Sequence, residues 1–356
     1  MKKLLALTLV GVMSLGLVAC GSEQAAAPEA PAATEEAAEE TAEETTEETA
    51  EETTEEAAEA TADASYNVGI CQLVQHPALD AATEGFKTAL DDELGAGVVT
   101  FDEQNAQGDS NTCATIANSF VSSNYDLILA NATAPLQAAA AATDSIPVLG
   151  TSITDYATAL EISDWTGTVG TNVSGTSDLA PLDQQADMIA ELFPEAKTVG
   201  LLYCSAEPNS QYQVDVIEGY LTEKGYTCTQ YGFSDSNDLS SVCTTANDNS
   251  DVIYVPTDNT AASNTELINN ICYGSTPIVA GEEGICAGCG VATLSISYYD
   301  LGYTTGQMAA KILKGEADVA SMPVEFAPNV TKKYNVANVE ALGLTVPDGY
   351  EAIEAE

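Results

Sequence analysis

The sequence contains no arginine, and its basic residues are nine lysines and a single histidine against 55 aspartates and glutamates. The formal net charge of −46 at pH 7 argues against nucleic acid as a partner, because nucleic-acid-binding surfaces need positive charge to displace counterions. The same charge disfavours polyanionic substrates, whereas a zwitterion, a cation or a neutral solute remains acceptable. If the ligand carries a carboxylate, N–H groups at helix starts and hydroxyls must hold it in place of arginine.

The single histidine limits the catalytic sites that this chain can build. A Ser-His-Asp or Cys-His site would have to use His76, which precedes Pro77, and proline is typical of the first turn of a helix. The chain also lacks the Gly-x-Ser-x-Gly nucleophile elbow of many hydrolases. A secreted hydrolase is therefore the disfavoured alternative, and we expect no catalytic residue.

Two short segments invite a metal or cofactor interpretation, and neither supports it. Cys286-Ala287-Gly288-Cys289 would need a second pair of ligands to hold zinc. Gly281-Glu282-Glu283-Gly284 lacks the Gly-Lys-Ser/Thr ending of a phosphate-binding loop. We expect no metal and no cofactor. The chain has nine cysteines, and if one is lipidated, the even number left is compatible with disulfides or with buried free thiols.

The first twenty residues resemble a lipoprotein signal peptide. Lys2 and Lys3 precede the apolar run Leu4 to Val18, which is too short for a confident membrane span. Leu17-Val18-Ala19-Cys20 resembles a bacterial lipobox and predicts lipidation of Cys20. Residues 1–20 are then the signal peptide, and the mature protein is extracytoplasmic and lipid-anchored to the outer face of the cell membrane.

Residues 21–65 form an acidic segment of mostly Ala, Thr and Glu, with no aromatic residue before Tyr66. Such a composition buries too little apolar area to offset chain entropy, and its like charges repel one another. We expect a disordered linker that tethers the folded body.

The body from Tyr66 onward alternates short apolar runs with helical periodicities, which predicts an α/β fold with two parallel sheets. Two successive series of strands and helices indicate two lobes. Expected helices include Pro77–Leu94, Thr133–Ala142, Gln211–Lys224, Thr260–Ile271 and Tyr299–Leu313, and expected strands include Tyr66–Leu73, Leu127–Ala130, Val199–Tyr203 and Val252–Val255.

Several motifs resemble one family of bacterial ABC-transporter substrate-binding lipoproteins, which includes binders of tryptophan and tyrosine. Tyr203-Cys204-Ser205-Ala206-Glu207-Pro208-Asn209-Ser210 resembles its Tyr-Asn-x-x-Glu-Pro-Asn-Ser segment, with Cys204 in place of Asn. The segments around Val68–Asp80, Asn105–Asp109, Asn172–Asp178 and Pro256–Asn259 also resemble the family, whereas Tyr156–Gly167 departs from it.

The resemblance implies a type I periplasmic-binding-protein fold with two Rossmann-like lobes joined by a three-segment hinge. The lobes would be 66–170 plus 298–323 and 171–297 plus 324–356. It also implies that the chain is a monomer that captures a small zwitterionic solute, with an aromatic amino acid favoured, and delivers it to an ABC permease and its ATPase. A solute sensor that presents its ligand to a membrane receptor and a binder of a sugar or nucleoside-like solute remain alternatives.

Candidate ligand-binding residues lie in loops and helix starts that follow predicted strands, where open α/β sheets place their ligands. A carboxylate would be held by Thr133, Ser205 and Ser210. An ammonium would be held by Glu207, Asp258 or Glu282, and further hydrogen bonds would come from Gln72, Asn209 and Asn259. Helix caps and turns are the structural alternative for each of these residues.

Overall fold

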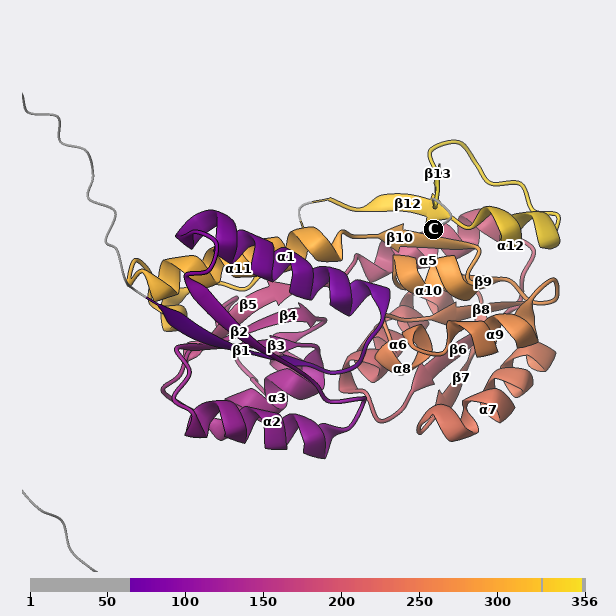
Figure 1. Ribbon diagram of the computed structural model, residues 1–356. Coiled ribbons are helices and arrows are strands. Elements are labelled where there is room, and N and C mark those ends of the chain that lie inside the picture. The colour runs from indigo at the N-terminus through magenta and orange to yellow at the C-terminus, as the bar shows by residue number, and fades with distance from the viewer. Residues whose placement is uncertain (1–64, 328, 354–356) are drawn as a thin grey trace, which may run out of the picture. The chain divides into compact units, whose positions relative to one another are not determined.

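The computed structural model describes residues 65–327 and 329–353 of the chain (Figure 1). The predicted signal peptide with Cys20 and all of the predicted linker except Ser65 lie outside the described residues. The described part has the predicted α/β class, with helices packed on two sheets whose strands are nearly all parallel.

The first sheet has six strands in the order β11-β5-β4-β3-β1-β2, and all of its pairings are parallel. Its strands are β1 (Tyr66–Gln72), β2 (Val99–Asn105), β3 (Leu127–Asn131), β4 (Val148–Ile153), β5 (Val173–Ser177) and β11 (Glu325–Phe326). The helices of this half are α1 (Pro77–Leu94), α2 (Ser110–Ser122), α3 (Thr133–Ala142), α4 (Tyr156–Ala159), α11 (Tyr298–Leu313) and the 3₁₀ helix η1 (Val319–Ser321).

Both faces of the first sheet are covered by helices, with α1 and α11 on one face and α2 and α3 on the other (Figure 1). Val68 of β1 packs with Phe86 of α1 and Met308 of α11. Cys71 points to the opposite face and packs with Phe120 of α2. A strand buried on both faces needs apolar residues at consecutive positions, which explains the unbroken apolar runs in the sequence.

The second sheet has seven strands in the order β13-β12-β10-β9-β8-β6-β7, and only β10 and β12 pair antiparallel. Its strands are β6 (Thr198–Cys204), β7 (Thr227–Phe233), β8 (Val252–Val255), β9 (Ile278–Ala280), β10 (Ala292–Ser295), β12 (Thr331–Tyr334) and β13 (Glu351–Ala352). Its helices are α5 (Leu182–Leu192), α6 (Pro208–Glu223), α7 (Ser236–Asn249), α8 (Asn259–Ala262), α9 (Thr265–Cys272), α10 (Glu283–Cys289) and α12 (Val336–Ala341).

The second sheet repeats the architecture of the first. Its parallel strands β6 to β10 follow the same relative order as β1 to β5, with the first strand between the second and the third. Tyr254 of β8 packs with α5 and α6 on one face, while Ile253 packs with α7 and α9 on the other. In sheets of this order, ligands bind beyond the carboxyl ends of the strands beside the first strand.

The sheet pairings correct two details of the expected division into lobes. Residues 173–177 and 325–326 were expected in the second lobe, but they form β5 and β11 of the first sheet. β5 pairs in parallel with β4, and β11 then pairs with β5 as the edge strand. The chain therefore passes between the sheets after β5, after β10 and after β11, a few residues beyond two of the expected boundaries.

The described residues also correct two local expectations in the second half. The helix expected over Thr260–Ile271 is two helices, because α8 ends at Ala262 and α9 begins at Thr265. The acidic, glycine-containing segment expected as a loop starts helix α10, which Glu282 caps.

The cysteines in the described ranges are free thiols, which is the second of the two alternatives that the sequence left open. Most are buried, and the sulfur atoms of Cys243 and Cys272 lie 3.8 Å apart in the core under α7 and α9.

Candidate functional site

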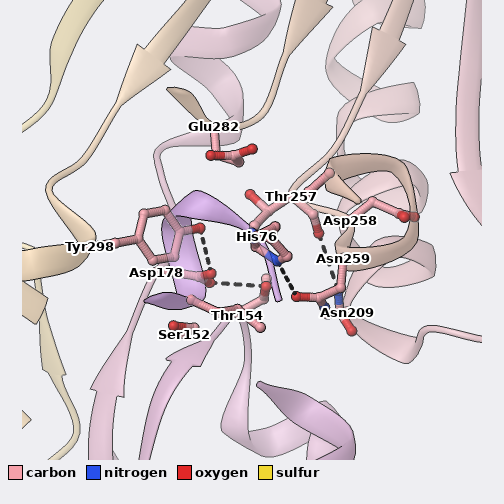
Figure 2. A pocket seen from close by; sticks show the side chains of 12 residues that line it. His76, Ser152, Thr154, Asp178, Asn209, Thr257, Asp258, Asn259, Glu282 and Tyr298 are labelled. Carbon is pink, nitrogen blue, oxygen red and sulfur yellow. Dashed lines mark hydrogen bonds between the residues drawn. The ribbon is translucent and has the colours of Figure 1, made fainter. Parts of the chain in front are cut away.

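A pocket lies where the carboxyl ends of strands from both sheets face one another (Figure 2). It encloses about 280 Å³ of space between atoms, its open mouth included. The lining residues are His76, Leu79, Ser152, Thr154, Asp178, Asn209, Thr257, Asp258, Asn259, Ala262, Glu282 and Tyr298.

Each half of the molecule supplies polar side chains from positions at or just after strand ends. In the first half, His76 follows β1, Ser152 lies in β4 and Asp178 follows β5. In the second half, Asp258 follows β8 and Glu282 follows β9. The parallel direction of these strands brings segments that are far apart in the sequence to one edge of each sheet.

Two of the three acids in the pocket are helix caps. Asp258 accepts hydrogen bonds from Ala261 N at 2.7 Å and, with its other oxygen, from Cys204 N at 2.6 Å. Glu282 accepts from Ile285 N at 2.5 Å and from Gly284 N at 2.6 Å. Each carboxyl oxygen of the two acids thus accepts from a backbone N–H group. The bonds from Ala261, Gly284 and Ile285 fix the starts of α8 and α10, and the bond from Cys204 ties Asp258 to the end of β6.

The third acid, Asp178, is held by hydroxyl groups. Thr154 Oγ1 donates to its Oδ1 at 3.0 Å, and Tyr298 Oη donates to its Oδ2 at 2.8 Å (Figure 2). Asp178 is buried, with 3% of its surface exposed. Each carboxylate oxygen can accept more than one hydrogen bond. Asp178 makes no helix cap, and both groups that hydrogen-bond to its oxygens are side-chain hydroxyls.

Burial raises the pKa of all three acids. The pKa of Asp258 rises to about 7, first through desolvation and then through the nearby charge of Glu207. Desolvation also raises the pKa of Glu282 to about 7, against the two N–H bonds that lower it. The pKa of Asp178 is raised by desolvation, while the bonds from Tyr298 and Thr154 act in the opposite direction. A cation in the pocket would offset this cost of burying negative charge.

Ser152 is placed by an irregularity in its strand. The register between β4 and β5 shifts between Gly150 and Ile153, and Ser152 has a positive φ of 57°. Bulges of this kind redirect side chains and are common beside functional sites. Ser152 Oγ lines the pocket, is buried, and has no hydrogen-bond partner among the described residues.

His76 links the two halves of the pocket. Its Nε2 lies 3.2 Å from Oδ1 of Asn259, the first residue of α8 (Figure 2). Asn259 is in turn held by Glu207, which accepts from Asn259 Nδ2 at 2.7 Å and from Asn259 N at 3.0 Å. The other oxygen of Glu207 accepts from the amide and the hydroxyl of Thr260.

Four of the nine predicted ligand-binding residues line the pocket, namely Asn209, Asp258, Asn259 and Glu282. Asn209 is already engaged, because its Nδ2 donates to Thr257 O, Ser210 Oγ and Glu207 Oε2.

The other five predicted residues do not contribute to the lining. Gln72 is buried, and its side chain donates to Asp80 and accepts from Thr83, both of α1. Thr133 is buried at the start of α3. Ser205 is exposed and donates to Phe233 O. Glu207 holds the segment 257–260 in place without lining the pocket, because it accepts from Asn259 and Thr260. Ser210 accepts from Asn209, which also donates to Thr257 O.

Sequence reasoning proposed no ligand contact for six polar lining residues: His76, Ser152, Thr154, Asp178, Thr257 and Tyr298. Asp178 ends the motif Asn172–Asp178 and follows β5, so its position after a strand could have indicated it. Thr257 stands beside Asp258 in another quoted motif. Nothing local marks Ser152, because its strand irregularity is visible only in the sheet register.

In the described ranges, no group of three or more His, Cys, Asp and Glu residues is arranged to hold a metal ion. None of the helices there combines the length and the apolar character that crossing a membrane requires.

The model of the family described as "ABC transporter substrate binding protein" matches residues 67–354. A protein named "Tyrosine-binding protein" from Clostridioides difficile is 36% identical over 281 residues, which is 78% of this chain and 81% of that protein.

Two solved structures of similar sequence share the fold. A domain from Streptococcus pneumonia in complex with L-Trp is 33% identical, with a TM-score of 0.77, and the match covers 81% of this chain and all of that one. The ligand-free, open structure of a substrate-binding protein from Clostridium difficile is 37% identical, with a TM-score of 0.63, and the match covers 82% of this chain and all of that one.

Proposed function

The chain belongs to the ABC transporter substrate-binding protein family, and we propose that it captures an aromatic amino acid, tyrosine or tryptophan, for import. The named relatives support the ligand class, since one is called tyrosine-binding and another was solved with L-Trp. Proteins of this family bind solutes outside the cytoplasm for an ABC permease and its ATPase. The chain then acts as a binding protein and not as an enzyme.

The observation that carries the amino-acid assignment is the buried carboxyl of Asp178, held by two hydroxyls at the pocket wall. An ammonium group paired with Asp178 would supply the positive charge that three buried acids and a chain without arginine leave uncompensated. Asp258 and Glu282 then shape the pocket as helix caps and add to its negative electrostatic potential. This places the ammonium at an acid other than Glu207, Asp258 and Glu282, the three that the sequence suggested.

Ligand entry requires the pocket walls to separate, because the pocket encloses only about 280 Å³, its open mouth included, whereas small-molecule sites usually enclose about 300–1,000 Å³. We propose that the three passages between the sheets, after β5, β10 and β11, act as the hinge. The lobes would then divide near residues 178, 296 and 327. The contact between His76 and Asn259 would break on opening and re-form on closure.

We further propose that the protein is a monomeric lipoprotein held at the outer face of the cell membrane through Cys20. The lipobox-like residues Leu17 to Cys20 and the acidic linker support this arrangement. A lipid at the far end of a linker of about 45 residues leaves the binding pocket free to reach the permease.

Calorimetric titration of the purified protein with tyrosine, tryptophan, phenylalanine and a neutral sugar tests the proposal. We expect binding of the aromatic amino acids, and we expect Asp178→Asn to cost about 2–5 kcal/mol of binding free energy. Asp144→Asn, an exposed aspartate of the same half, is the matched control and should bind as wild type does. Tight sugar binding with no response to any amino acid would overturn the ligand class.

A further inference from the structure

His76 carries a buried ring nitrogen whose hydrogen-bonding capacity is unused. The residue stands just before α1 with an extended backbone, makes no helix-cap bond with its side chain, and is only 7% exposed. Nε2 contacts Asn259 Oδ1, whereas Nδ1 is buried without a hydrogen-bond partner among the residues that the structure describes. Because His76 lines the pocket, a bound ligand is the natural partner of Nδ1.

The side-chain amide of Asn259 has one allowed orientation. Its Nδ2 donates to Glu207 Oε2 at 2.7 Å, and a flipped amide would place its oxygen against that carboxylate. Glu207 accepts hydrogen bonds on both oxygens, as an ionised carboxylate does. Asn259 Oδ1 therefore faces His76, and this oxygen can only accept a hydrogen bond.

An acceptor opposite Nε2 determines the state of the imidazole. Nε2 must carry the proton that it donates to Asn259 Oδ1. Burial lowers the pKa of His76 below its usual value of 6.5, although the bond to Asn259 and the charges of Glu207 and Asp80 act in the opposite direction. The neutral ring carries one N–H group, so the buried Nδ1 of this pocket-lining residue keeps an unused lone pair.

We propose that His76, held in its Nε2–H form by Glu207 through Asn259, accepts a hydrogen bond at Nδ1 from the ammonium group of the bound ligand. This inference rests on the proposed function for the identity of the ligand. The ammonium has three N–H groups, so it can bond to Asp178 and to Nδ1 at the same time. Asp178 supplies charge, and Nδ1 supplies a directional acceptor that an ammonium satisfies and a deaminated analogue leaves unpaired.

The same arrangement ties ligand recognition to closure. His76 belongs to the first half of the molecule, whereas Glu207 and Asn259 belong to the second. When the walls separate, His76 loses the oxygen that fixes its tautomer. The tautomer with an unprotonated Nδ1 is therefore selected only in the closed arrangement, in which the ammonium is enclosed.

The first test reads the tautomer directly, because His76 is the only histidine in the chain. A tag-free protein labelled with ¹⁵N-histidine gives one imidazole in a long-range ¹H–¹⁵N correlation spectrum. At pH 7.5 with saturating tyrosine, we expect a protonated Nε2 and an unprotonated Nδ1 whose resonance shows that it accepts a hydrogen bond. A protonated Nδ1, or an imidazolium, in the complex would overturn the inference.

The second test asks whether Glu207 controls the His76 tautomer by orienting the Asn259 amide, and not merely by its negative charge. Glu207→Gln allows the Asn259 amide to turn and should shift the histidine towards a mixture of tautomers. Glu266→Gln removes one exposed charge from the same half of the molecule and should leave the tautomer unchanged. Equal spectra for wild type and Glu207→Gln would contradict the control of His76 by Glu207.

The third test asks whether the contact is to the ammonium. His76→Ala should weaken tyrosine binding about 10- to 100-fold, the usual effect of losing a hydrogen bond to a charged group. It should change the binding of the deaminated analogue, 3-(4-hydroxyphenyl)propionate, much less. Equal losses for both compounds would overturn the assignment to the ammonium. If neither tyrosine nor tryptophan binds the wild-type protein, the proposed function fails, whereas tyrosine binding that His76→Ala leaves unchanged overturns this inference alone.

A pH series adds an independent readout. Protonating His76 converts Nδ1 into a donor and adds a positive charge beside the ammonium, so affinity should fall as pH drops through the pKa of His76, which burial lowers. Asp178, Asp258 and Glu282, whose pKa values burial raises, also face the pocket, and the charged groups beside the ring are Glu207 and Asp80. The dependence that belongs to His76 is therefore the part that His76→Ala removes. An unchanged pH dependence in that variant would contradict the inference.

Discussion

Tyr298 Oη donates a 2.8 Å hydrogen bond to Asp178 Oδ2, although the two residues are 120 positions apart in the sequence. Asp178 follows β5 of the first sheet, and Tyr298 begins α11 after β10 of the second. The bond therefore joins two of the three passages between the sheets. Burial raises the pKa of Tyr298 well above its usual value, so its phenol remains a donor and keeps Asp178 in position at the pocket wall.

Removing this hydroxyl should weaken ligand binding, because it removes a bond that positions Asp178. Tyr298→Phe takes away one donor from Asp178 and leaves the ring packing in place. We expect tyrosine affinity to fall about tenfold, since a hydrogen bond to a charged group contributes about 1.5–3 kcal/mol. Tyr299→Phe is the control, because its side chain is 37% exposed and points away from the core. Equal affinities of the two variants by calorimetry would show that Tyr298 does not position Asp178.

Glycine at the contact between α1 and α11 should be essential for stability. A Cβ atom at Gly302 would overlap the backbone carbonyl of Ala82, and one at Gly85 would overlap that of Tyr299. Gly302→Ala should therefore lower the free energy of unfolding by about 1–3 kcal/mol, as overpacking usually does. Gly219→Ala in α6 meets open space and should raise the free energy of unfolding by up to about 1 kcal/mol. Urea denaturation measures both, and equal signs would contradict the packing argument.

Glu282 should make stability depend on pH around neutrality. Its pKa rises from 4.5 to about 7 on folding, so the folded state holds a proton that the unfolded state has lost between these values. Its contribution is complete below the unfolded pKa and is lost as pH rises through about 7. Relative to Glu282→Gln, wild type should therefore lose about 3 kcal/mol of unfolding free energy between pH 4.5 and pH 8. A constant difference between the two proteins would mean that Glu282 stays ionised.

Replacing Cys20 should separate membrane attachment from binding. Cys20→Ala removes the proposed acylation site, and we expect the protein in the soluble fraction with unchanged affinity for its ligand. Cell fractionation and calorimetry of the released protein measure the two effects. Retention of the variant in the membrane fraction would point to a second anchor and would contradict the lipobox interpretation.

The alternation of strands and helices was readable from local sequence because its causes are local. Pro77 begins α1, and the predicted bounds of α1, α3 and β8 agree with the structure. Local pattern was insufficient where an element depends on its neighbours. Asn264, an N-cap residue type, is the local signal of the break between α8 and α9 that the helix prediction over 260–271 did not use, whereas β11 is a strand only because β5 offers it a partner.

The composition and motifs of the sequence determined the family, the α/β class and the need for a ligand that tolerates an acidic, arginine-free protein. They also placed Asp258, Asn259, Glu282 and Asn209 near the ends of strands. Tertiary structure alone decided which groups hydrogen-bond to each acid. Glu282 accepts from N–H groups of the helix that it begins, Asp258 accepts from Ala261 of its helix and from Cys204 of β6, and Asp178 receives hydroxyls from Thr154 and from the distant Tyr298. A sequence shows which groups can form hydrogen bonds, but their partners depend on contacts between segments that only folding brings together.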